Sequence, residues 1–146
     1  MKKLLIRLVS SDNNAGSLLL RVPVGVILIA HGAQKLFAWF GGYGLEGTGS
    51  WMASIGLEPG YLMALMAGSA EFFGGIGLVL GLLTRPAASV AAITMLVGLV
   101  VVHLGNGFFL DGGGIEYALA LLAATTALAI QGGGMLSIDR IINRYV

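Results

Sequence analysis

The chain has no cysteine and few charged residues, and both shortages narrow what it can be. Without cysteine it can form no disulfide, no CxxC redox pair, no thiolate metal site and no cysteine nucleophile. Charged residues make up 10% of the 146 residues, whereas a soluble domain carries about 25%. A net charge of +1 gives no electrostatic case for binding nucleic acid. The chain therefore lacks the polar surface of a water-soluble protein, and any redox role requires a bound cofactor or a partner protein.

The sequence is instead rich in apolar residues, which make up 57% of it, and its mean hydropathy is +0.92. A membrane helix needs about 20 mainly apolar residues. Four stretches come near that length, at residues 18–40, 59–83, 86–104 and 115–131. Glycine is spread through these stretches, which suits close approach of helices in lipid. The sequence thus predicts an all-α fold, an integral membrane four-helix bundle that forms a single domain over residues 1–146.

The basic residues predict how this bundle is oriented. If the spans alternate in direction, seven of the eight lysines and arginines fall on one side of the membrane: Lys2, Lys3, Arg7, Arg21, Arg85, Arg140 and Arg144. The other side holds four acidic residues, with Lys35 as the only nearby base: Glu46, Glu58, Asp111 and Glu116. Because basic residues gather on the cytoplasmic side, we expect both termini in the cytoplasm.

Three segments outside the spans have amphipathic patterns. Residues 1–9 and 137–146 mix basic and apolar residues as interfacial helices do, and a frayed polar end is the alternative. In the outer loop at residues 41–58, residues 50–57 predict a short helix with Ser50 as its N-cap. With Trp51 on its apolar face, this helix is either an interfacial anchor, which we favour, or a lid over the outer mouth of the bundle.

Ionisable residues within the spans are the strongest functional signal. Glu71 lies near the middle of the second span, where a carboxylate costs several kcal/mol unless it finds a proton, a partner or water. On the first span His31 and Lys35 share a helical face, with Gln34 at its edge. At a rise of about 1.5 Å per residue, Glu71 and His31 come near mid-membrane and Lys35 lies about a turn further out. Two further residues lie toward the outer side, His103 at the depth of Lys35 and Glu116 at the rim.

Two interpretations of this polar set remain open. In the structural one, Lys35 pairs with Glu71 or Glu116, and the polar contacts fasten helices at about 1 kcal/mol each. In the functional one, the set lines an outward-facing cavity that binds a polar head group and exchanges protons. We favour the second, because ionisable residues inside a membrane are functional by default. With two histidines and no Glu-x-x-His pair, neither haem nor a di-metal site is expected. The pattern assigns no catalytic residue.

Several short motifs resemble those of a known family. The run HGAQKL at residues 31–36 resembles the Gly-x-x-Lys-Leu motif in the first helix of the DoxX family. AEFFGG at residues 70–75 and LGLLTR at residues 80–85 resemble its second-helix signature and the turn that follows. GGIEYAL at residues 113–119 and GMLSID at residues 134–139 are similar to the start of its fourth helix and its closing Gly-x-x-Ser-x-Asp. The motifs follow in the family's order across nearly the whole chain.

Membership in this family implies a small four-helix, multi-pass protein of the bacterial inner (plasma) membrane. The family is named for its resemblance to the membrane subunit of a thiosulfate:quinone oxidoreductase. Some relatives are described as parts of membrane oxidoreductase complexes linked to thiol and oxidative-stress handling. The resemblance therefore implies a quinone-binding membrane subunit, non-catalytic alone, that works with a soluble oxidoreductase partner. We expect quinone as its ligand and no covalently bound cofactor.

Two other functions stay open at this stage. The chain could bind or transport a small or lipid-like solute, with Glu71 as the protonatable group. Four helices make a narrow bundle, so transport would require a homo-oligomer. It could instead be a scaffold whose polar residues only hold helices together. An ion pair with Lys35 and a neutral acid are both open for Glu71.

Overall fold

A computed structural model of the chain describes residues 6, 9–10 and 14–145. Over this part the chain folds into helices joined by turns and loops, without a strand, which confirms the predicted all-α class. Four helices dominate the structure: α2 (Ala15–Phe37), α4 (Gly60–Leu80), α5 (Thr84–Gly98) and α6 (Glu116–Gln131). Most of the amphipathic segment predicted at residues 1–9 lies outside the described residues.

Shorter elements connect these helices. Between α2 and α4 come a 3-10 turn, η1 (Trp39–Gly41), and the helix α3 (Gly44–Ser54). After α5 come a π-helical turn, η2 (Leu99–His103), and two 3-10 turns, η3 (Leu104–Asn106) and η4 (Leu110–Gly112). The short helix α7 (Ile138–Asn143) follows α6.

Among the residues that the structure describes, three helical stretches are long and apolar enough to cross a membrane: Ala15–Phe37, Gly60–Leu80 and Thr84–Asn106. The helix α6 is apolar but has only 16 residues. At about 1.5 Å per residue it is about 24 Å long, short of a hydrocarbon core of about 30 Å. It ends there because Gly132 takes a positive φ of 81° and leaves the helical path.

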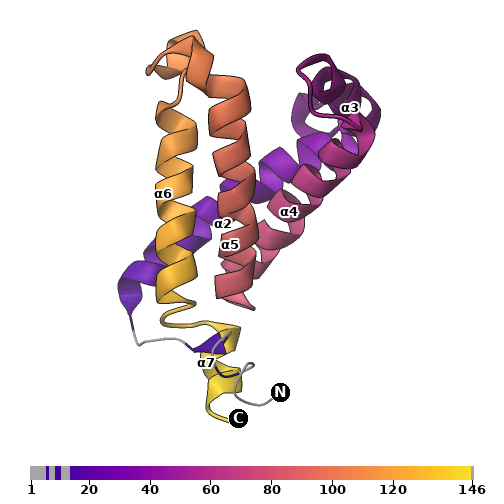
Figure 1. Ribbon diagram of the computed structural model, residues 1–146. Coiled ribbons are helices and arrows are strands. Elements are labelled where there is room, and N and C mark those ends of the chain that lie inside the picture. Colours follow the sequence, from indigo (N-terminus) through magenta and orange to yellow (C-terminus); the bar gives the residue numbers. More distant parts are fainter. Residues whose placement is uncertain (1–5, 7–8, 11–13, 146) are drawn as a thin grey trace.

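The long helices form two pairs, α2 with α4 and α5 with α6 (Figure 1). The pairs meet at the end of the molecule that holds the start of α2 and α7, which we call the terminal end. They diverge toward the opposite end, the loop end, where α3 and the turns after α5 lie (Figure 1). Buried side chains of all four helices form one core between the pairs: Val24, Leu28, Leu78, Ala88, Ala91, Leu121 and Leu128.

Glycines let α2 and α4 approach closely. A Cβ at Gly25 would lie 2.7 Å from the carbonyl oxygen of Gly75, and a Cβ at Gly75 would lie 2.7 Å from that of Gly25. A Cβ at Gly32 would likewise meet the backbone of Phe72 at 2.4 Å. Such backbone contact replaces the hydrophobic driving force that helices lack in lipid. It also fixes the register that places α2 side chains opposite those of α4.

The terminal end is held by Arg21, whose side chain is 1% exposed. Its guanidinium donates hydrogen bonds to five carbonyl oxygens at 2.5–3.2 Å: Leu78, Val79, Gly133, Met135 and Leu136. The first two belong to the last turn of α4, where carbonyls have no helical partner. Because guanidinium has five N–H donors and stays charged, one side chain caps α4 and fixes the segment after α6.

Asp139 ties α7 to the start of α5. Its buried carboxylate accepts hydrogen bonds from the backbone N–H groups of Leu83, at 2.7 Å, and Thr84, at 2.8 Å. A negative charge at a helix N-terminus is stabilised by the helix dipole. The segment predicted as a C-terminal interfacial helix is therefore anchored on one side, while Ile141 and Tyr145 remain exposed.

The predicted helix in the outer loop differs from the observed one. Sequence reasoning placed it at residues 50–57 with Ser50 as its N-cap, but α3 begins at Gly44. Ser50 lies inside it, and its hydroxyl donates to the carbonyl of Glu46 at 2.9 Å. Glycine disfavours helices, so the glycine-rich start of α3 was not predicted. Packing against α4 stabilises the helix there instead. Gly49 lies so close to the backbone of α4 that a Cβ would meet Tyr61 at 2.9 Å.

Candidate functional site

Toward the loop end a partly open cavity of about 680 Å³, which we call the helix cavity, lies between the two helix pairs. Ligand sites typically measure about 300–1,000 Å³ and are mainly apolar. Residues of α2 to α6 and η2 contribute to its wall, and most of them are apolar, among them Met52, Met63, Met66 and Met95. Sequence reasoning predicted a polar cavity. The structure has a largely apolar one with a few polar groups on its wall.

The main polar feature is the ion pair of Lys35 and Glu71, whose Nζ and Oε2 atoms lie 2.7 Å apart. The Glu71 side chain is 4% exposed and that of Lys35 is 23% exposed. The register of α2 against α4 brings the two together across the glycine contact. Of the alternatives open from the sequence, the partner of Lys35 is thus Glu71 rather than Glu116, and the carboxylate is paired rather than isolated.

His31 also lines the helix cavity, one turn before Lys35 on α2. Its ring contacts that of Tyr117 on α6, with ring centroids 6.2 Å apart and planes tilted by 54°. Aromatic pairs are favourable at centroid distances of about 4.5–7 Å. This contact joins the two helix pairs beside the ion pair. Tyr117 was not predicted as a site residue, because the sequence does not distinguish an aromatic side chain that lines a cavity from one that only packs; its position directly after Glu116 was the available signal.

His103 reaches the helix cavity from the π-helical turn η2. Its Nδ1 lies 2.7 Å from the carbonyl oxygen of Gly113. A carbonyl can only accept, so Nδ1 carries the hydrogen, and in the neutral ring Nε2 is left as an acceptor. Single π turns within helices occur frequently at functional sites. The hydrogen bond to Gly113 holds the His103 ring against the loop that precedes α6.

Two predicted site residues lie elsewhere. Glu116 accepts a hydrogen bond from the backbone N–H of Leu110 at 2.7 Å, so its carboxylate organises the loop before α6 and does not line the helix cavity. The side chain of Gln34 donates to the carbonyl of Phe40 at 3.3 Å and faces a second pocket. The structure therefore brings together four of the six predicted residues: His31, Lys35, Glu71 and His103.

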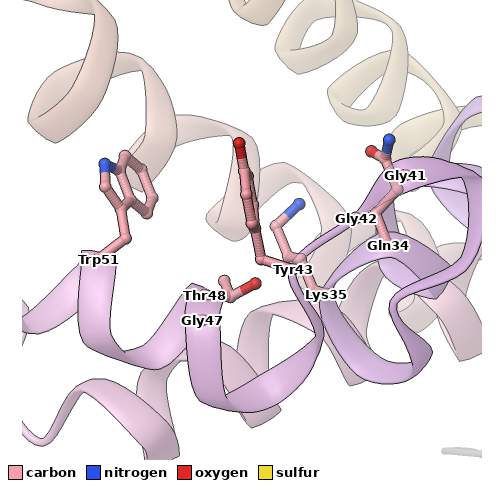
Figure 2. A pocket seen from close by; sticks show the side chains of 8 residues that line it. All are labelled: Gln34, Lys35, Gly41, Gly42, Tyr43, Gly47, Thr48 and Trp51. Carbon is pink, nitrogen blue, oxygen red and sulfur yellow. The ribbon is translucent and has the colours of Figure 1, made fainter.

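The second pocket, which we call the loop pocket, measures about 510 Å³. It lies between the end of α2 and α3 (Figure 2) and is lined by Gln34, Lys35, Gly41, Gly42, Tyr43, Gly47, Thr48 and Trp51. Lys35 and Trp51 line both cavities. Among the described residues, histidine, aspartate and glutamate nowhere form a group of three or more that could hold a metal ion.

A family model described as DoxX matches residues 16–104, which are more than half of the chain. The chain belongs to the DoxX family. This stretch contains the four residues brought together at the helix cavity. It stops before the two motifs at residues 113–119 and 134–139 that also resemble the family.

Curated relatives of similar length support the assignment. "Putative oxidoreductase CatD" of Bacillus subtilis is 34% identical over 124 residues, which cover 85% of this chain and 84% of that protein. "Inner membrane protein YqjF" of Escherichia coli is 28% identical over 131 residues, or 90% of this chain and 95% of that protein. "Inner membrane protein YphA" of Escherichia coli is 31% identical over 128 residues, or 84% and 87% of the two chains. No solved structure matches.

Family, relatives and apolar helices agree on where the protein resides. Two relatives carry the inner membrane in their names, and the described part of this chain has three helices long and apolar enough to cross a bilayer. It is a multi-pass protein of the bacterial inner membrane, which confirms the predicted localisation.

Proposed function

We propose that this DoxX-family protein is the membrane subunit of a quinone-linked oxidoreductase system and that the helix cavity binds a quinone-like head group. The observation that carries this proposal is a Lys35–Glu71 ion pair on the wall of an otherwise largely apolar cavity of about 680 Å³. A lipophilic ring needs such an apolar wall, and a few placed polar groups orient it. The oxidoreductase name of the Bacillus subtilis relative points the same way.

The ion pair can receive a carbonyl oxygen without being broken. A lysine ammonium has three N–H donors, and Glu71 takes one of them. In the proposed complex another donor of Lys35 binds a carbonyl oxygen of the ring. The rings of His31 and Tyr117 and the methionines of the wall then supply apolar and aromatic contact.

The residues of the chain hold and move protons in this proposal. A bound quinone supplies the redox chemistry, since its reduction to the quinol takes up two electrons and two protons. Electrons come from a soluble oxidoreductase partner, because the chain has no cysteine and no metal-binding group among its described residues. Glu71 and His31 can exchange protons near the head group, and His103 on the same cavity wall is a further proton partner.

The proposed membrane arrangement makes α6 a fourth crossing within one domain. The start of α2 and the helix α7 lie at the same end of the molecule (Figure 1), as an even number of crossings requires. The basic residues Arg21, Arg85, Arg140 and Arg144 come from that end of the helices, so the positive-inside rule puts it in the cytoplasm. The loop end, with both cavities, then faces the opposite side.

The direct test is to identify what the protein carries when purified in mild detergent. We expect mass spectrometry of extracted lipophiles to find about one quinone per chain in the wild type. We expect Glu71→Gln to lose most of it, because its amide cannot hold the Lys35 ammonium as a carboxylate does. Circular dichroism of both proteins shows whether the helices are intact.

Other outcomes select the competing functions. A different stoichiometric lipid would favour the second candidate, a protein that binds or transports a lipid-like solute, which the methionine-rich apolar wall also suits. If neither protein holds a lipophile and Glu71→Gln is less stable than the wild type, the ion pair is only a structural contact between α2 and α4.

A further inference from the structure

We propose that the loop pocket is a second ligand site, which takes a small planar organic carboxylate from the water-facing surface of the loop end. This site lies beside the lipophile site of the proposed function, with which it shares Lys35 and Trp51, but it does not require that a lipophile binds there. Three features carry the proposal: two exposed aromatic rings, a set of donors without a carboxylate, and an ammonium group shared with the helix cavity.

Two aromatic side chains at the loop pocket are exposed rather than packed into the core. Tyr43 is 82% exposed and Trp51 is 44% exposed. Figure 2 shows both rings rising from the same side of the pocket, with Thr48 between them at its base. Planar ligands stack on such rings. The Tyr43 side chain lies over Gly47, where a Cβ would come within 2.7 Å of the Tyr43 Cβ, so glycine is needed at this position.

The polar groups of the pocket favour an anion. Its lining side chains carry an ammonium, an amide and two hydroxyls, from Lys35, Gln34, Tyr43 and Thr48, whereas the indole nitrogen of Trp51 lies on the edge of its ring turned away from Tyr43 (Figure 2). Within the part of the chain that the structure describes, no carboxylate lines it. Figure 2 shows the side chains of Lys35, Tyr43 and Thr48 along the loop pocket. These donors match carboxylate oxygens, which only accept hydrogen bonds.

The nearest carboxylate, Glu71, does not cancel this preference. It is the deeper member of the ion pair, 4% exposed against 23% for Lys35, and it lines only the helix cavity. The ion pair therefore presents its positive end to the loop pocket. Since Lys35 and Trp51 belong to both cavities, an occupant of either one contacts the side chains that bound the other.

Three probes separate the features that the site would recognise. Benzoate is planar and negative, benzamide is planar and neutral, and cyclohexanecarboxylate is negative but not planar. The chain has two tryptophans, so Trp39→Phe leaves Trp51 as the only indole reporter. We expect fluorescence titrations in nanodiscs to give benzoate a Kd about tenfold lower than that of either other probe.

Variants then assign the binding to the loop pocket. In the Trp39→Phe background, Tyr43→Leu is expected to weaken benzoate binding about tenfold. Phe109→Leu changes an exposed aromatic residue that lines neither cavity, and it should leave benzoate affinity unchanged. The double variant Lys35→Met/Glu71→Met removes both charges together and should bind benzoate and benzamide equally.

The proposal is overturned if the three probes bind within twofold of one another, if none produces a saturable Trp51 signal, or if Tyr43→Leu binds benzoate as the wild type does. Its failure is distinguishable from that of the quinone proposal. Selective benzoate binding in a protein that carries no quinone would retain the loop pocket and reject the lipophile site, and the reverse result would do the opposite.

Discussion

Replacing Arg21 by methionine should lower the free energy of unfolding by about 4 kcal/mol. Five backbone carbonyls at the terminal end accept hydrogen bonds from its guanidinium. Two of them belong to the last turn of α4, where Leu78 also accepts from the N–H of Gly81. A buried acceptor left without a donor costs about 1–3 kcal/mol, and water entering the opened site recovers part of that. Unfolding by sodium dodecyl sulfate, followed by circular dichroism, measures the change.

Two further variants make the Arg21 prediction specific. Arg21→Lys keeps the charge but offers three donors on a compact ammonium, so it should recover less than half of the lost stability. Arg144→Met removes an exposed arginine after α7 and should change the unfolding free energy by less than about 0.5 kcal/mol. If Arg21→Met unfolded like Arg144→Met, Arg21 would not hold the terminal end together.

The second large effect concerns the Lys35–Glu71 pair. Lys35→Met leaves the nearly buried carboxylate of Glu71 without its partner, which should cost about 3 kcal/mol of stability. Replacing both residues by methionine should restore most of that loss, because two apolar side chains of similar size leave no charge unpaired. A double-mutant cycle on unfolding free energies gives the coupling.

The same double-mutant cycle distinguishes an ion pair that is purely structural from one that binds a ligand. A purely structural pair predicts that the double variant regains whatever function the protein has along with its stability. A binding pair predicts a stable double variant that no longer holds the ligand. Equal stability of the wild type and both single variants would contradict the ion pair itself.

The long helices were predictable because each apolar run allows few alternatives. Even so, α2 begins at Ala15 rather than at residue 18, since the Asn14 side chain caps it by accepting from the N–H of Gly16 at 2.7 Å. Asparagine is a preferred N-cap, so this signal was present in the sequence. The pairing of Lys35 with Glu71 was one of two predicted options, and the glycine contact between α2 and α4 decides it.

What the sequence could not predict depends on contacts between distant segments. Arg21 has the pattern of a charge that marks orientation, and its carbonyl partners lie 57–115 residues away along the chain. The sequence position of Glu116 predicts a polar group at the rim of the bundle, but its carboxylate accepts a hydrogen bond from a backbone N–H of the loop before α6. The loop pocket exists only because glycine-rich residues fold as α3 against α4, a choice made by packing against local propensity.

The most direct test of the central claim is a titration of the protein in nanodiscs with a short-chain benzoquinone and a short-chain naphthoquinone. We expect saturable binding of at least one of them to the wild type, with one site per chain. We expect Lys35→Met/Glu71→Met to bind it at least tenfold more weakly while it unfolds cooperatively. No saturable binding to the wild type, or equal binding to the double variant, would contradict a quinone site at this ion pair.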